Sequence, residues 1–99
     1  MANLYKPDGT VSIVTPKRAK WSLSELQELV QGDIEMMPGI KTRVIFNEMA
    51  ALKSLPINQK ATYFVQQMLV TKVSGNMGML RYLPVLRGNV VVLTIGEKM

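Results

Sequence analysis

The stretch W-S-L-S-E-L-Q-E-L-V-Q-G-D-I-E-M-M-P, residues 21–38, predicts a short capped helix that ends at a glycine and continues directly as a strand. Ser22 is a candidate N-cap, and Glu25 three residues later completes the spacing of a capping box. Trp21, before the cap, can pack on Leu26 as a hydrophobic staple. The stretch places a helix next to a strand, which indicates a mixed α and β fold.

The helix is expected over residues 23–31, because its apolar residues recur at the spacing of one helical face. These residues are Leu23, Leu26, Leu29 and Val30. Gly32 can adopt the left-handed conformation that closes a helix. Residues 33–37 then alternate as a strand, which Pro38-Gly39 ends.

Two further strands are predicted before this helix, over residues 2–6 and 10–15, on either side of the turn Pro7-Asp8-Gly9. Proline presets the first dihedral angle of such a turn, and glycine accepts a positive φ. Val11 and Ile13 share one face of the second strand, in the alternation that is typical of a half-buried strand.

The second half of the chain predicts a hairpin and a second helix. Residues 42–47 form a strand that pairs with residues 33–37. One short helical turn is expected at residues 48–55, and Asn58 is then a good N-cap for a helix over residues 59–71. The apolar face of this helix consists of Ala61, Phe64, Val65, Met68 and Leu69.

Residues 90–95 are β-branched and almost wholly apolar, which favours a central strand buried on both faces. Residues 80–86 are expected to be extended, with an interruption at Pro84. The elements together predict one α+β domain over residues 1–99, with two helices packed on a small, mostly antiparallel sheet in the order β-β-α-β-β-α-β. Because such a sheet has edges, we expect a homodimer or a higher homo-oligomer.

The composition excludes several kinds of chemistry. The 99 residues include no cysteine and no histidine, so disulfides, thiolate metal ligands and the commonest general base are absent. The seven carboxylates do not follow a metal-ligand pattern. We therefore expect no metal site, no cofactor and no enzymatic activity. The net charge of +5 favours an anionic partner: a nucleotide, a nucleic acid or an acidic protein surface.

No segment of the sequence predicts membrane insertion. The N-terminal residues lack a basic region followed by an apolar run, which a signal peptide would need. The longest apolar run, Val90–Leu93, is far too short to span a bilayer. We expect a protein of the cytoplasm with no membrane partner.

Three stretches are candidates for recognition. Tyr82 follows Arg81 and lies near Arg87, and an aromatic ring beside arginines can stack on a base and hold its phosphate; a tyrosine at a strand edge gives the same pattern. The densest basic run, residues 17–20, is either a binding patch or a solvated loop. Residues 75–78, G-N-M-G, fail both phosphate-loop templates and indicate a ligand loop or a plain flexible loop.

Several of these segments match a known pattern in order and spacing. They are Y-K-P-D-G at 5–9, the leucine-rich helix and its glycine at 22–35, N-E at 47–48, L-K-S-L-P-I-N-Q-K-A-T at 52–62 and R-G-N-V-V-V-L at 87–93. The chain thereby resembles a small family known as domain of unknown function 3846, found in phages, plasmids and the bacteria that carry them. It departs from the family at Met49, where a glycine is usual, in the hairpin turn at 37–41, and at Asn89, where an aspartate is usual.

The resemblance implies a phage or mobile-element accessory protein in the cytoplasm of a bacterial host. Together with the charge and the lack of catalytic groups, it favours a non-enzymatic antagonist of host defence that sequesters an anionic nucleotide signal. The candidate ligand-binding residues are Asn47, Asn58, Lys60, Thr62, Arg81, Tyr82 and Arg87. The alternatives are a protein–protein inhibitor of a host factor, a weak nucleic-acid-binding accessory protein, and an accessory domain without a ligand.

Overall fold

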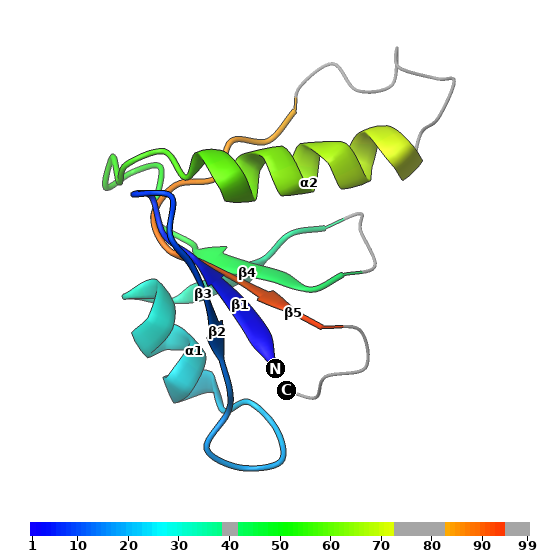
Figure 1. The fold of residues 1–99 in the computed structure, drawn as a ribbon. Coiled ribbons are helices and arrows are strands. Elements are labelled where there is room, and N and C mark those ends of the chain that lie inside the picture. Colours follow the sequence, from blue (N-terminus) through cyan, green and yellow to red (C-terminus); the bar gives the residue numbers. More distant parts are fainter. Residues whose placement is uncertain (39–41, 73–82, 95–99) are drawn as a thin grey trace.

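The computed structural model of the chain describes residues 1–38, 42–72 and 83–94. In these residues a five-stranded sheet lies between two helices, with α2 above and α1 below in Figure 1. The elements are β1 (Ala2–Tyr5), β2 (Val11–Val14), α1 (Leu23–Val30), β3 (Ile34–Met36), β4 (Val44–Asn47), α2 (Gln59–Lys72) and β5 (Val90–Leu93). The predicted order β-β-α-β-β-α-β is confirmed, as is the antiparallel sheet.

The strands lie in the order β2-β1-β5-β4-β3, and every neighbouring pair is antiparallel. The prediction that residues 90–95 hold the central strand is confirmed, because β5 lies between β1 and β4. Val90 and Val92 pack toward α2, whereas Val91 and Leu93 pack toward α1. A strand covered on both faces needs apolar residues at every position, which explains the V-V-V-L run.

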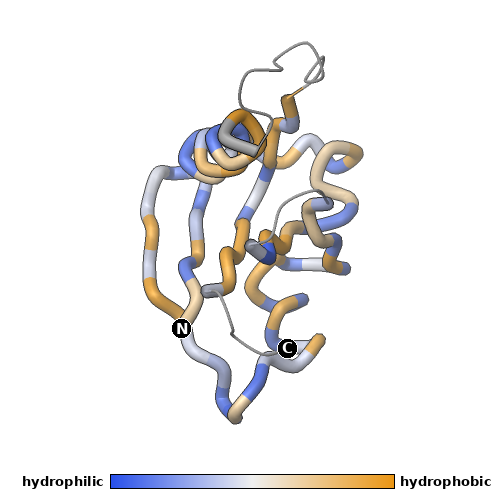
Figure 2. Tube along the Cα trace, turned by 90° about the vertical axis from the view of Figure 1, so that its right-hand side faces the viewer, coloured by the Kyte–Doolittle hydropathy of each residue, from blue (hydrophilic) through white to orange (hydrophobic). Residues whose placement is uncertain are grey.

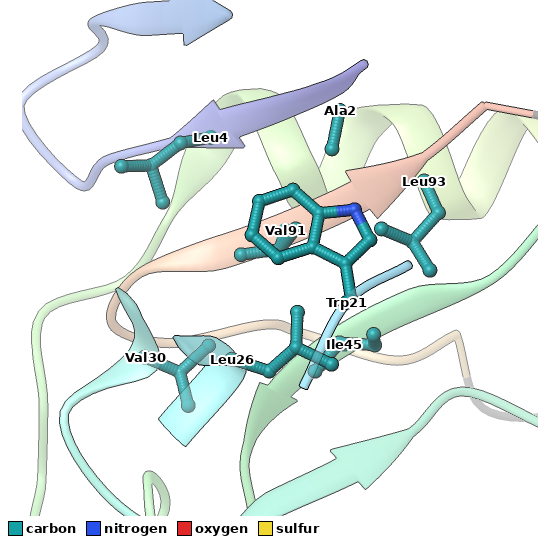
Figure 3. Close-up of a cluster of buried hydrophobic side chains, with 8 residues drawn as sticks. All are labelled: Ala2, Leu4, Trp21, Leu26, Val30, Ile45, Val91 and Leu93. Atoms are coloured by element: carbon teal, nitrogen blue, oxygen red, sulfur yellow. The ribbon is translucent and has the colours of Figure 1, made fainter. Parts of the chain in front are cut away.

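The core on the α1 side forms around Trp21, which is only 4% exposed (Figure 3). Its other buried members are Ala2, Leu4, Leu26, Val30, Ile45, Val91 and Leu93. Trp21 and Leu26 lie in the same cluster, as the staple predicts. The predicted N-cap is also confirmed, because the Glu25 backbone N–H donates to Ser22 Oγ at 3.2 Å. Residues 21–26 therefore fix both the start of α1 and its contact with the sheet.

The end of α1 differs from the prediction. Gln31, with φ of 63°, adopts the left-handed conformation expected of Gly32. Gly32 is required for a different reason, since a Cβ at this position would lie 2.6 Å from Nδ2 of Asn47. Asn47 Nδ2 donates to the carbonyls of Val30 and Gln31, both at 3.2 Å. The glycine thus admits the side chain that binds the last carbonyls of the helix.

The second core lies between the sheet and α2. Its buried members are Val44, Ala61, Val65, Leu86, Val90 and Val92. These residues come from β4, β5, α2 and the segment before β5, so α2 covers the centre of the sheet and leaves β2 uncovered. Val11 is 45% exposed and Ile13 is 67% exposed, so the prediction of a half-buried strand at 10–15 is wrong for these two residues.

Residues 48–54 form consecutive turns, which include the short helical turn expected at 48–55. One bond of helical type is present, from the Lys53 N–H to the Met49 carbonyl at 2.9 Å. Residues 83–86 form no strand, and Arg87 makes an isolated bridge with Ile57. The rest of the stretch predicted as extended, residues 80–82, lies outside the described residues, as does the G-N-M-G loop.

The turn between β1 and β2 predicts a specific pH dependence. Asp8 Oδ1 accepts hydrogen bonds from the Thr10 backbone N–H at 2.9 Å and from Thr10 Oγ1 at 2.7 Å. These bonds, the backbone one first, lower the pKa of Asp8 below its ordinary value of 3.8. Because the folded-state pKa is depressed, the stabilisation is complete above the ordinary pKa and is lost as the pH falls through the folded-state value.

We expect an NMR titration of the Asp8 carboxyl carbon to give a midpoint below 3.8. In the Asp8→Asn variant the amide oxygen still accepts from Thr10, so the turn should persist while this part of the acid dependence of unfolding disappears. A midpoint at or above the ordinary value would show that the Thr10 bonds do not hold the carboxylate.

Candidate functional site: a groove beside α2

An open cavity of about 610 Å³ lies along one side of α2, facing the end of β1. It is lined by Tyr5, Gln59, Lys60, Tyr63, Phe64, Gln67 and Met68. This volume is typical of small-molecule sites, which occupy roughly 300–1,000 Å³. We call this cavity the α2 groove.

The helical repeat places the lining residues of α2 in one row. Residues 59–60, 63–64 and 67–68 recur at intervals of four, which brings them onto one side of the helix. The neighbouring side is buried through Ala61 and Val65, which pack on the sheet. The row therefore lies just beside the part of α2 that is in contact with the sheet.

Tyr5 supplies the opposite wall from the last position of β1. Its ring lies 6.1 Å from the ring of Phe64, at an interplanar angle of 38°. This is within the separation at which aromatic rings attract one another. Tyr63, one residue before Phe64, is 65% exposed and gives the groove a ring that is accessible from solvent.

The lining suits a flat, negatively charged ligand. Tyr5, Tyr63 and Phe64 offer aromatic faces and edges, and Lys60 offers an exposed ammonium group. The two glutamines carry amides that both donate and accept hydrogen bonds. None of the described residues that line the groove carries a carboxylate, so no lining group repels an anion.

Of the seven residues predicted to bind a ligand, Lys60 lines the groove directly. Asn58 lies behind it and is fully buried. Its Nδ2 donates to the carbonyl of Tyr5 at 2.9 Å and to that of Gly88 at 2.8 Å. Its Oδ1 accepts from the backbone N–H of Ala61 at 3.2 Å, which confirms the predicted N-cap of α2. Asn58 thus ties together the two walls of the groove.

Two other predicted residues also bind backbone within the fold. Thr62 Oγ1 accepts from the Leu86 N–H at 2.8 Å and donates to the Leu86 carbonyl at 3.3 Å. Asn47 is buried on the other face of the sheet, where it holds the end of α1 and its Oδ1 accepts from the Met49 N–H at 2.8 Å. The structure therefore separates Asn47 from the groove.

Arg87 lies away from the α2 groove. Its Nη1 donates to the carbonyl of Leu55 at 3.1 Å, and it lines a smaller cavity of about 170 Å³ together with Glu35 and Glu48. Arg81 and Tyr82 lie outside the described residues. The structure thus brings Lys60 and its support Asn58 to one site, and it places Arg87 elsewhere.

Sequence reasoning missed Tyr5, Tyr63 and the glutamines of the groove. One signal was present: Tyr63 is a large aromatic residue on the side of α2 opposite to the predicted apolar face. A single exposed ring of this kind is ordinary on a protein surface, so the signal was not specific to binding. Tyr5 gave no such signal, because only the folded sheet brings β1 to α2.

The basic run at residues 17–20 follows β2 and is exposed throughout. Among the described residues, no three acidic side chains gather closely enough to hold a metal ion. Neither helix in the described part of the chain has the length and apolar character needed to cross a bilayer.

No family model, no curated protein and no solved structure matches the chain. The resemblance to the family of domain 3846 stays a prediction.

Proposed function

We propose that the chain is a non-enzymatic binding protein that holds an anionic nucleotide in the α2 groove. The observation that carries the proposal is the lining of the groove, in which three aromatic rings, one lysine and two amides occur without a carboxylate. The net charge of +5 supports it, because a positive protein draws anions from solution.

The roles follow from the chemistry of each group. Tyr63, the exposed ring, stacks on the base, and such stacking contributes about 1–3 kcal/mol for each base. Lys60 pairs with a phosphate, since its flexible stem places a compact positive charge where the ligand needs it. Gln59 and Gln67 hydrogen-bond the edge of the base or the sugar hydroxyls. Asn58 acts as a positioning residue, because it fixes Tyr5 and the first turn of α2.

The wider role rests on the resemblance to a phage and plasmid family. We propose an accessory protein in the bacterial cytoplasm that sequesters a nucleotide signal of host defence. Binding alone is sufficient for this task, because a protein that removes a free signal need not transform it. We also propose that the chain acts as a homodimer or a higher homo-oligomer.

Isothermal titration calorimetry with mononucleotides, cyclic mononucleotides and cyclic dinucleotides tests the site. We expect at least one nucleotide to bind. Tyr63→Ala should weaken that binding about tenfold to a hundredfold through loss of stacking. Lys60→Glu should weaken it by about tenfold or more, because it replaces an attraction by a repulsion.

Lys53→Glu is the matched control, since it makes the same charge change at an exposed lysine that does not line the groove. It should leave the affinity nearly unchanged. Absence of heat with every nucleotide would contradict the proposal, as would equal losses in Lys60→Glu and Lys53→Glu. A stable protein partner from a host lysate would favour the inhibitor alternative, and a salt-dependent gel shift would favour nucleic acid.

A further inference from the structure

The two edges of the sheet differ in their protection against pairing with another chain. The β3 edge has only three residues, carries Glu35 and is followed by Pro38. A short strand, a charge and a proline are the features that keep an edge from pairing. The β2 edge, with the sequence V-S-I-V, is one residue longer and carries no charged side chain, although Pro16 follows it at the same spacing as Pro38 follows β3.

The register shows which backbone groups β2 leaves open. The Lys6 N–H donates to the Thr10 carbonyl at 2.9 Å, so this carbonyl faces β1. Antiparallel pairs alternate, so the backbone groups of Ser12 and Val14 also face β1, whereas those of Val11 and Ile13 face outward. Each of these two residues therefore presents one N–H donor and one carbonyl acceptor at the free edge.

The side chains of the same two residues form an apolar strip. Val11 and Ile13 lie opposite Tyr5 and Asn3, on the face that also carries α2. They are 45% and 67% exposed, because α2 covers the centre of the sheet and does not reach β2. In Figure 2 the strand on the far left is this free edge, with hydrophobic residues along it.

We propose that β2 pairs antiparallel with β2 of a second copy of the chain, about a twofold axis, to form a continuous ten-stranded sheet. The edge is complementary to itself. In a twofold antiparallel pairing, Val11 of each copy lies opposite Ile13 of the other copy. Ser12 lies opposite Ser12, with both side chains on the other side of the sheet. This proposal does not depend on the ligand of the α2 groove.

Charges at the two ends of β2 also fit a second copy. Asp8 precedes the strand, with its carboxylate held against Thr10, and Lys17 and Arg18 follow it; all three are exposed. Antiparallel pairing brings Lys17 and Arg18 of one copy to Asp8 of the other. Lys6 repels the same two cations, but it lies on β1's side of the turn, opposite Thr10, and so one strand away from the paired edge.

Sedimentation velocity at increasing protein concentration tests the pairing, because the population of a dimer follows mass action. Pairing of two four-residue strands makes a small interface, so we expect the dimer to accumulate as the concentration approaches about 1 mM. Ile13→Lys should weaken association by about tenfold or more, because it places a charged side chain in the apolar strip that contacts the second copy. Leu52→Lys, at a side chain that is 79% exposed on another segment, should leave the association intact.

Amide hydrogen exchange of the wild-type chain gives an independent result that does not require a folded variant. We expect the amides of Val11 and Ile13 to gain protection as the concentration rises, while those of Ser12 and Val14 are protected throughout. A chain that stays monomeric at the highest concentration overturns the proposal. A dimer in which Val11 and Ile13 stay unprotected, or in which Ile13→Lys associates like wild type, overturns it as well.

Discussion

Trp21→Ala is expected to lower the free energy of unfolding by about 3–5 kcal/mol, the range for removing a large aromatic residue from a core. The indole is the largest side chain of the α1 core and packs among residues of β1, α1, β4 and β5 (Figure 3). Its loss leaves a cavity that well-packed neighbours cannot fill, because they belong to four different elements. Urea unfolding followed by circular dichroism measures the change.

Tyr63→Ala is the matched control for this prediction. It also removes an aromatic ring, but from a side chain that is 65% exposed, so its cost should stay within about 0.5–1 kcal/mol. Equal destabilisation by the two variants would show that Trp21 does not anchor the core. The pair also separates stability from binding, since Tyr63→Ala should change affinity and Trp21→Ala should change folding.

The second large effect is expected at Asn58, where alanine should cost about 3 kcal/mol. The substitution removes two donors and one acceptor at once. The carbonyls of Tyr5 and Gly88 lose the hydrogen bonds that this amide donates, and α2 loses its N-cap. A buried group that loses its partner costs more than the net value of the bond, so this effect should exceed that of an ordinary cap.

Ser22→Ala is the comparison, because it removes an exposed cap from α1 and should cost about 1 kcal/mol. Asn58→Asp keeps the acceptor for Ala61 but sets a buried carboxylate oxygen against the carbonyls of Tyr5 and Gly88, so its cost includes charge burial as well as the two lost bonds. If Asn58→Ala costs no more than Ser22→Ala, the asparagine is a cap alone. If the full loss is observed, the walls of the α2 groove depend on it.

Local sequence signals predicted the parts of the fold that depend on neighbours in the chain. The caps at Ser22 and Asn58 and the apolar run of β5 are such cases, and all three are confirmed. The predicted end of α1 was wrong in detail, because Gly32 is required to make room for the side chain of Asn47, fifteen residues later. The exposure of Ile13 was missed because it depends on where α2 lies.

The same distinction applies to the candidate site. Lys60 was selected from sequence and does line the groove, whereas the groove itself exists only because β1 meets α2. Asn47 and Asn58 were selected because they lie in the motifs of the family resemblance, but sequence alone does not distinguish an amide that binds a ligand from one that binds backbone. Both amides bind backbone in the structure, and Asn58 does so at the wall of the groove.

The central position of β5 has a consequence for synthesis on the ribosome. β5 follows both helices and the other four strands in the chain, yet it lies between β1 and β4 and joins the two halves of the sheet. Until its residues have left the exit tunnel, the β1–β2 and β3–β4 hairpins have no strand to connect them, and both helices lack the part of their apolar contact that β5 provides. The nascent chain therefore completes its sheet after translation of residues 90–93, and contacts this distant in sequence form slowly.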